Sequence, residues 1–452
     1  MTHGAGRARG HPRRRRHAWL AGLLLSACAV ASPPARAVAF DFWFAHGGAY
    51  ARAIQALCDG FNASAAPDRV RCVSQGNYSQ TLRKAVAAYR TGTQPALVEI
   101  YDVGTADMLL SGAIRPVDAL LRAAGLPDGR AGMLPVVAGY YATRGGMLES
   151  QPFSVSTLVL YANPQKLLAA GIATPPQHWA TFARDLALLK AHGEACPAVF
   201  DFSPWKLLEQ TSASAGVAVA SADNGHAGLA ARYVFAGGPE LRLLRDLGHW
   251  YAQGLIRLPA ATRGGSQALA FADGECALSI DSTSASSVIA RTGRVVPWVG
   301  LVPVYADRPR YSSTLGGSSL WVFKGHAPPV YRAVAHFLDY LRQPRQQARF
   351  AQATGYLPPS RQGAQALAAA GAPPVIARSI ATGIASLEQP ANAYSIGIRL
   401  GFVPQFRLIW QEEIERALAG QQSMRAALDR AQARGNRLLE RFQAIYAGVP
   451  LP

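Results

Sequence analysis

The chain has 452 residues, of which 50% are hydrophobic and 16% are charged. This balance provides enough apolar side chains for large buried cores and excludes a disordered protein, a collagen and a coiled coil, while the length favours two lobes over one. The formal net charge of +18 does not indicate a nucleic-acid-binding surface, because the arginines are scattered and seven of them lie in the first 37 residues.

The first 37 residues have the pattern of a secretory signal peptide. Arg13–Arg16 precede an apolar stretch, Ala18–Ala31, that is too short to span a bilayer. The leader ends in Ala-Arg-Ala, and we expect cleavage after Ala37 and export to the periplasm. In the alternative interpretation, Leu25-Ser26-Ala27-Cys28 resembles a lipobox and leaves a lipidated Cys28 at the mature N-terminus.

Short strands alternate with amphipathic helices after the leader. The expected elements are strands at Val38–Trp43, Arg69–Val73 and Ala96–Tyr101, and helices at Tyr50–Phe61, Tyr78–Tyr89 and Ala106–Leu110. Short turns join these elements. Such an alternation is typical of a parallel sheet that is covered by helices on both faces.

The same pattern continues through the rest of the chain. The expected elements there are strands at Thr157–Tyr161, Ala277–Ile280 and Ser319–Phe323, helices at Trp179–Lys190 and Val330–Leu341, and a mostly helical tail from Pro404. We therefore predict an α/β protein of two lobes with helices added at the C-terminus. A cleft between two lobes is a common place for a small-molecule site.

Four cysteines remain after the leader, and export would place them in an oxidising compartment. Cys58 comes late in an expected helix and Cys72 lies in the following strand, so these two could meet. That pairing would leave Cys196 and Cys276 for a second disulfide. The sequence alone allows three connectivities, and buried free thiols are a further alternative.

The mature chain lacks the common catalytic motifs. Its seven histidines include no two at metal-ligand spacing on one helix, and there is no G-x-S-x-G, no G-x-x-x-x-G-K-[ST] and no G-x-G-x-x-G after a strand. An exported α/β protein without a catalytic set is more simply explained as a binding protein than as an enzyme. We predict no cofactor and no metal.

Five short blocks of the mature chain stand out together. They are Gly76–Tyr78, Tyr101–Ala106, Ser150–Phe153 with Ser156-Thr157, Thr354–Pro358, and Gly397–Gly401 with Pro404–Arg407. Their order, spacing and residues resemble those of the glycerol-3-phosphate-binding members of extracellular solute-binding protein family 1, which serve ABC importers. The resemblance runs from about Phe40 to Phe442, and its second and fifth blocks are the specific ones.

The resemblance implies a two-lobe periplasmic binding protein fold of type II, like that of maltodextrin-binding proteins. The N-terminal lobe would comprise residues 38–154 and 312–353, and the C-terminal lobe residues 155–311 and 354–452. It also implies a monomer that captures sn-glycerol 3-phosphate, or a glycerophosphodiester, between closing lobes. The partner would be the membrane subunits of an ABC permease, and nucleic acid would not be a partner.

Matched block by block, the resemblance implies eight ligand-contacting residues. They are Tyr78, Asp102, Ser156, Trp205, Ser282, Gly317, Tyr356 and Arg407. Arg407 would anchor the phosphate, because a guanidinium can donate two parallel hydrogen bonds to its oxygens, and Arg399 is the alternative anchor. The alternative interpretation, without the resemblance, is a surface arginine that pairs with Glu412 or Glu413.

The other residues have structural alternatives as well. Asp102 ends a strand, where its carboxylate can accept hydrogen bonds from glycerol hydroxyls. The glycines before Ser319 would let backbone amides approach phosphate, or would simply form a tight turn. The serine and tyrosine hydroxyls would donate to the ligand, or would cap strand and helix ends.

Two departures from the family pattern affect the glycerol end of the expected site. The family has a glutamate where this chain has Asp102, and a second tryptophan where Phe202 stands near Trp205. We therefore keep two alternatives to glycerol-phosphate binding. One is a binder of a neutral sugar or maltodextrin in the same fold, and the other is an exported phosphodiesterase or phosphatase.

Overall fold

The computed structural model describes Met1, residues 37–64, residues 68–449 and Leu451. The predicted signal peptide and the alternative lipobox at Cys28 lie almost entirely at residues 2–36, outside the described residues. The described residues from Ala37 onward form one compact unit. None of the helices described is both long and apolar enough to cross a membrane.

The strands of this unit form two sheets. The first has the order β2 (Arg69–Ser74), β1 (Ala39–Phe44), β3 (Leu97–Tyr101), β11 (Gly316–Phe323) and β4 (Ile114–Arg115), with β5 (Gln151–Ser156) also paired to β11. The second has the order β10 (Trp298–Gly300), β6 (Leu158–Ala162), β9 (Leu278–Ser282), β7 (Ala198–Val199) and β8 (Ile256–Arg257).

The sheets are mixed, so the expected parallel pairing is found in only part of each sheet. The pairs β1–β2 and β1–β3 are parallel, as are β7–β8 and β7–β9. However, β11 runs antiparallel to β3, β4 and β5, and β6 runs antiparallel to β9 and β10. The alternation of strand and helix along the chain does not predict the direction of a strand such as β11, which joins the first sheet from a distant part of the sequence.

The helices occupy most of the remaining chain. In the first half they are α1 (Gly48–Ala63), α2 (Tyr78–Arg90), α3 (Thr105–Leu110), α4 (Val117–Ala123), α5 (Pro135–Tyr141), α6 (Pro164–Ala169), α7 (Trp179–Ala191), α8 (Thr211–Ala215) and α9 (Ser221–Asn224). In the second half they are α10 (Pro239–Ala252), α11 (Gln267–Ala272), α12 (Ala285–Thr292), α13 (Pro328–Arg342), α14 (Pro344–Thr354), α15 (Arg361–Ala369), α16 (Pro374–Leu387), α17 (Val403–Leu418) and α18 (Met424–Ile445). The predicted helical tail is confirmed.

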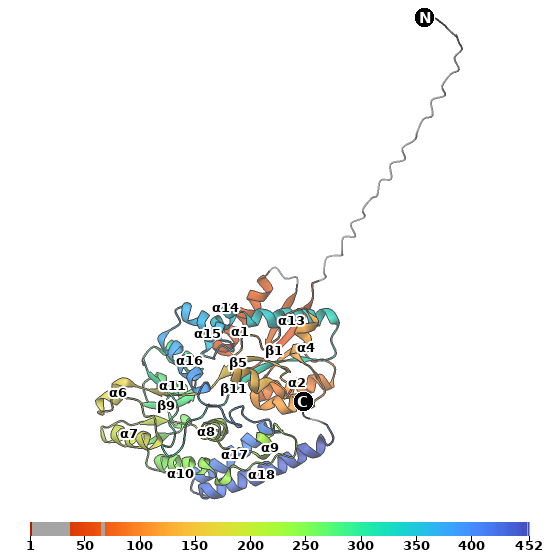
Figure 1. Ribbon diagram of the computed structural model, residues 1–452. Helices are drawn as coiled ribbons and strands as arrows, with labels where there is room; N and C mark the ends of the chain where they lie inside the picture. The colour runs from red at the N-terminus through yellow and green to blue at the C-terminus, as the bar shows by residue number, and fades with distance from the viewer. Residues whose placement is uncertain (2–36, 65–67, 450, 452) are drawn as a thin grey trace. The chain divides into compact units, whose positions relative to one another are not determined.

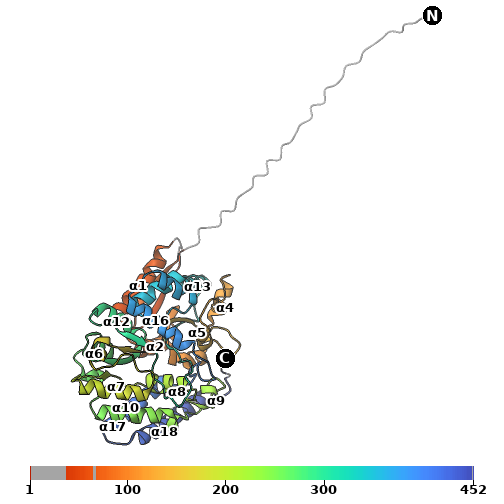
Figure 2. The same cartoon turned by 60° about the vertical axis from the view of Figure 1, so that its left-hand side comes forward.

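Two groups of helices cover the two ends of the unit. In both views α1 and α13 lie at one end, and α10, α17 and α18 lie at the other (Figures 1 and 2). Phe337 of α13 packs against Phe40 and Phe42 of β1, with ring centroids 6.0 Å apart in each pair. This contact buries the apolar face of α13, which repeats at helical spacing in the sequence.

Both candidate disulfides are formed. Cys58 on α1 is bonded to Cys72 on β2, and Cys196 is bonded to Cys276. The second bridge follows from strand pairing, because Ala198 of β7 lies opposite Leu278 of β9 and thereby brings the residues two positions earlier side by side. The structure thus selects one of the three connectivities that the sequence allowed.

Candidate ligand-binding site

Most of the eight expected contact residues lie at or near the ends of secondary-structure elements. Asp102 follows β3 and opens a 3-10 turn, η1 (Asp102–Gly104), and Tyr78 is the first residue of α2. Ser156 and Ser282 are the last residues of β5 and β9. Side chains at such positions leave the packed layers, so they are free to face a ligand.

Arg407, Glu209 and Asp102 form a buried charged cluster. Arg407 donates from Nε and Nη2 to Glu209 Oε1 at 3.1 and 2.8 Å, and from Nη2 to Glu209 Oε2 at 2.9 Å. Its Nη2 also lies 3.9 Å from Asp102 Oδ2. The side chains of Asp102 and Glu209 are 5% and 4% exposed, and that of Arg407 is 23% exposed.

The electrostatics of this cluster favour a charged arginine more than a charged aspartate. Burial raises the pKa of Asp102 to about 7, and the negative charge of Glu209 adds to this effect, whereas Arg407 opposes it. Burial disfavours the charged guanidinium of Arg407, but Glu209 and Asp102 outweigh this effect and raise its pKa. Asp102 Oδ2 has no hydrogen-bond partner among the described residues.

The helix that carries Arg407 is held by aromatic residues on either side of it. Phe406 stacks on Tyr233 with ring centroids 4.1 Å apart, and Trp410 Nε1 donates to the Phe202 carbonyl at 2.9 Å. Both Phe406 and Trp410 are fully buried. These contacts fix the rotation of α17 and turn Arg407 toward Asp102.

Tyr78 lies on the Asp102 side of the site. Asn77 caps α2, because its Oδ1 accepts from Gln80 N at 2.9 Å, and α2 therefore begins at Tyr78. The Tyr78 ring stacks on Tyr101, the residue before Asp102, with centroids 5.4 Å apart. Burial raises the pKa of Tyr78, and its hydroxyl has no hydrogen-bond partner among the described residues.

Tyr356 connects this region to Ser282. Burial raises the pKa of Tyr356 to about 12, while its interactions with the hydroxyls of Tyr78 and Ser284 act in the opposite direction. The Ser284 hydroxyl in turn donates to Ser282 Oγ at 2.9 Å. Tyr356 therefore lies near both Tyr78 and Ser284, and Ser284, which the sequence analysis did not identify, contacts Ser282.

Gly317 is not in a turn before the strand, as expected, but inside it. β11 begins at Gly316, which lies opposite Ser156 of β5, and Gly317 lies opposite Val155. A Cβ on Gly317 would lie 1.5 Å from the Ser154 carbonyl oxygen, and its φ of +113° also favours glycine. A Cβ on Gly316 would lie 2.5 Å from the Trp205 ring. The glycines therefore permit close contact with β5 and with Trp205.

The alternative interpretation of Arg407, as a partner of Glu412 or Glu413, was wrong. Glu412 and Glu413 pair with Arg434 and not with Arg407. Arg399 is buried and donates from Nη2 to the backbone carbonyls of Tyr140 and Ala142 at 2.9 and 3.0 Å. It therefore serves the backbone at the end of α5.

Comparison with known proteins identifies the family. The sequence pattern of the bacterial extracellular solute-binding proteins matches residues 56–378. The sn-glycerol-3-phosphate-binding periplasmic protein UgpB of Escherichia coli (strain K12) is 33% identical over 407 residues, which cover 89% of this chain and 92% of that protein. The chain belongs to the bacterial extracellular solute-binding proteins.

Solved structures of such proteins share the fold. UgpB from Mycobacterium tuberculosis, in complex with glycerophosphocholine, superposes with a TM-score of 0.72 at 19% identity and covers 89% of this chain and 99% of its own. The GacH receptor of Streptomyces glaucescens superposes with a TM-score of 0.72 at 18% identity, with the same coverage. These likenesses confirm the fold prediction, and the family confirms a binding protein rather than an exported phosphatase or other enzyme.

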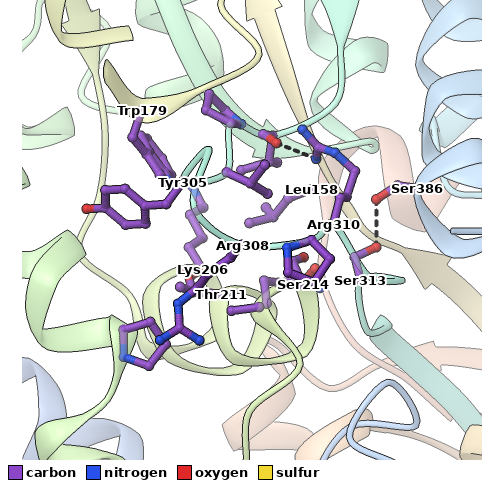
Figure 3. Close-up of a pocket in the computed structure, with 17 residues that line it drawn as sticks. Leu158, Trp179, Lys206, Thr211, Ser214, Tyr305, Arg308, Arg310, Ser313 and Ser386 are labelled. Atoms are coloured by element: carbon purple, nitrogen blue, oxygen red, sulfur yellow. Dashed lines mark hydrogen bonds between the residues drawn. The ribbon is translucent and has the colours of Figure 1, made fainter. Parts of the chain in front are cut away.

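A small pocket of this solute-binding protein lies beside the charged cluster. It is lined by Lys206 and Gln210, which flank Glu209 in the chain, and by Trp179, Tyr305 and Arg310 (Figure 3). Its volume is about 40 Å³, and none of the eight expected contact residues lines it. One water needs at least about 10–15 Å³ by this measure, so this volume has room for only a few waters. The pocket is therefore too small for a glycerol phosphate.

Glu209 is the main residue of this site that the sequence analysis missed. It lies on a π-helical segment, η2 (Trp205–Gln210), in which Trp205 is the expected aromatic wall. Its place directly after two buried leucines is the one available signal, since a carboxylate in an apolar run requires a partner. That signal does not reveal which cation, 198 positions along the chain, is the partner.

Proposed function

We propose that this solute-binding protein captures sn-glycerol 3-phosphate, or a glycerophosphodiester, and delivers it to the membrane subunits of an ABC permease. The observation that carries the proposal is the half-buried Arg407 beside the buried Asp102, with Tyr78 and Trp205 on neighbouring segments. A guanidinium suits a phosphate and a carboxylate suits glycerol hydroxyls. The relatives named for sn-glycerol 3-phosphate, at 33–34% identity, support the same ligand.

In this proposal the ligand lies between two lobes that close over it. The N-terminal lobe comprises residues 38–154 and 312–353, and the C-terminal lobe comprises residues 155–311 and 354–452. The two sheets support this division, because the first draws its strands from residues 39–156 and 316–323 and the second from residues 158–300. The protein acts as a monomer in the periplasm, after cleavage at Ala37 or with lipid on Cys28.

Calorimetry with sn-glycerol 3-phosphate tests the proposal. We expect Arg407→Ala to weaken binding by about 2–5 kcal/mol, since the phosphate loses its charged partner. This range corresponds to roughly 30- to 5,000-fold in the dissociation constant. Arg407→Lys keeps the charge but not the planar fork, and should bind with intermediate affinity.

Arg434→Ala is the matched control, because Arg434, like Arg407, lies near two carboxylates, but it belongs to α18 and to none of the expected contacts. It should bind like the parent protein. Equal binding by Arg407→Ala and the parent would show that Arg407 is not the anchor. Stabilisation of the parent by maltodextrins, and not by glycerol phosphates, in a thermal-shift screen would overturn the ligand class.

A further inference from the structure

The Arg407 guanidinium has one edge engaged and one edge open. Its Nε and Nη2 donate to Glu209, whereas Nη1 donates to no partner among the described residues. The side chain keeps 23% of its surface exposed although both neighbouring carboxylates are almost fully buried. The open Nη1 edge is therefore the part of Arg407 that is available to a ligand while Glu209 stays in place.

Glu209 is fixed in position by the residues around it. Lys206, three positions earlier, pairs with Asp201 at 2.8 Å and with Asp281 at 3.2 Å. Gln210, the next residue, donates from Nε2 to the Thr314 carbonyl at 2.7 Å. π-helical segments such as η2 are frequent at functional sites. The contacts of Lys206 and Gln210 hold the segment that carries Glu209. A carboxylate on such a segment is suited to hold a guanidinium in one orientation.

The cluster is also short of positive charge. Glu209 and Asp102 carry one negative charge each when ionised, and Arg407 supplies one positive charge. Lys206 does not offset the difference, because it already faces two aspartates of its own. A phosphate monoester carries close to two negative charges above pH 7, whereas a diester carries one. The monoester therefore meets the stronger repulsion.

We propose that Glu209 is a positioning and specificity-determining residue. It holds the Nη1 edge of Arg407 toward the ligand, and its charge disfavours a doubly charged phosphate relative to a singly charged one. This inference rests on the proposed function, because it requires that Arg407 binds the phosphate group.

The test compares two probes that differ in charge at pH 8, sn-glycerol 3-phosphate and its methyl diester. Each dissociation constant is measured by calorimetry for the parent, Glu209→Gln, Glu209→Asp and Glu412→Gln. We expect Glu209→Gln to shift the affinity ratio about tenfold toward the monoester, as removal of one nearby charge implies. Glu209→Asp keeps the negative charge on a side chain that is one methylene shorter. It should weaken the binding of both probes and leave the ratio of their affinities unchanged.

Glu412→Gln is the control, because Glu412 is 53% exposed and pairs with Arg434. An unchanged probe ratio in folded Glu209→Gln, while Arg407→Ala has lost binding, would overturn the role of Glu209 and leave the proposed function intact. If Glu209→Gln proves unfolded, Glu209→Asp takes its place in the test. Because this variant keeps the negative charge, a change in its ratio of monoester to diester affinity would also overturn the charge argument. Failure of the parent to bind either probe would overturn the proposed function and this inference with it.

Discussion

Several carboxyl groups of this protein are buried without a full set of partners. Asp102 Oδ2, Asp107 Oδ2 and Glu240 Oε2 have no hydrogen-bond partner among the described residues. Burial raises the pKa of each of these three groups to about 7. A carboxyl group whose pKa is higher in the folded state than in the unfolded chain holds its proton more tightly when folded. Its contribution to stability is present below about pH 4 and is lost as the pH rises through about 7.

We expect Glu240→Gln to show this effect. Glu240 is fully buried on α10 and accepts a hydrogen bond from Ser212, which the amide oxygen of glutamine can also accept. The substitution should raise the free energy of unfolding by on the order of 1–3 kcal/mol at pH 8 and change it little at pH 4. Urea unfolding at both values measures the difference. An equal effect of Glu240→Gln at both pH values would contradict the prediction.

At the scale of elements, the two disulfides differ in the length of chain that they enclose. Cys58–Cys72 ties α1 to the adjacent β2 across 14 positions, whereas Cys196–Cys276 ties the residues before β7 and β9 across 80 positions. A cross-link restricts the unfolded chain more when it closes a longer loop. The second bridge is therefore expected to contribute more stability than the first.

This expectation is tested by replacing each cysteine pair with alanine. Loss of the Cys196–Cys276 bridge should cost about 4.5 kcal/mol, and loss of the Cys58–Cys72 bridge about 3 kcal/mol, on the chain-entropy relation. Denaturant unfolding of the oxidised protein and of both variants gives these values. A larger loss from the Cys58–Cys72 variant would show that local packing, and not loop length, governs the contribution of these bridges.

At the scale of the whole unit, a buried polar network lies where the chain crosses between the two sheets. Thr157 is the one residue between β5 of the first sheet and β6 of the second. Its hydroxyl lies 2.8 Å from Ser313 Oγ and 3.1 Å from the Thr314 carbonyl, on the connection from β10 to β11. Ser313 Oγ lies 2.8 Å from Ser386 Oγ on α16. These hydroxyls hold distant parts of the chain together at the crossing.

Thr157→Val removes this hydroxyl with little change of shape. It should lower the free energy of unfolding by about 1–3 kcal/mol, because buried partners of the hydroxyl lose a hydrogen bond. Thermal or urea unfolding measures the loss. Thr91→Val is the control, since Thr91 is exposed and its hydroxyl contacts, among the described residues, only its own turn: Thr93 and the carbonyls of Ala87 and Ala88. A loss no larger than that of the control would show that the network does not stabilise the crossing.

The sequence by itself determined the features that depend on neighbours along the chain. Apolar spacing predicted α1, α2, α7 and α13 and the strands β1, β2, β3, β6 and β9, because helical and extended segments repeat their buried positions at different intervals. The position of Asp102 at the end of a strand was equally local, and the sequence also placed Cys58 and Cys72 where they could meet, without fixing the disulfide. The blocks around Asp102 and Arg407 also indicated the family.

Only the tertiary structure decided the pairings between distant segments. The glycines at 316 and 317 resemble a turn in the sequence, but they belong to β11, where they pair with β5. They are glycines because β5 and Trp205 leave no space for a side chain there. Arg407 has several acidic residues within a few positions, yet its partner is Glu209, far away in the chain. An ion pair is selected by which side chains packing brings together and removes from water, and spacing along the chain does not contain that information.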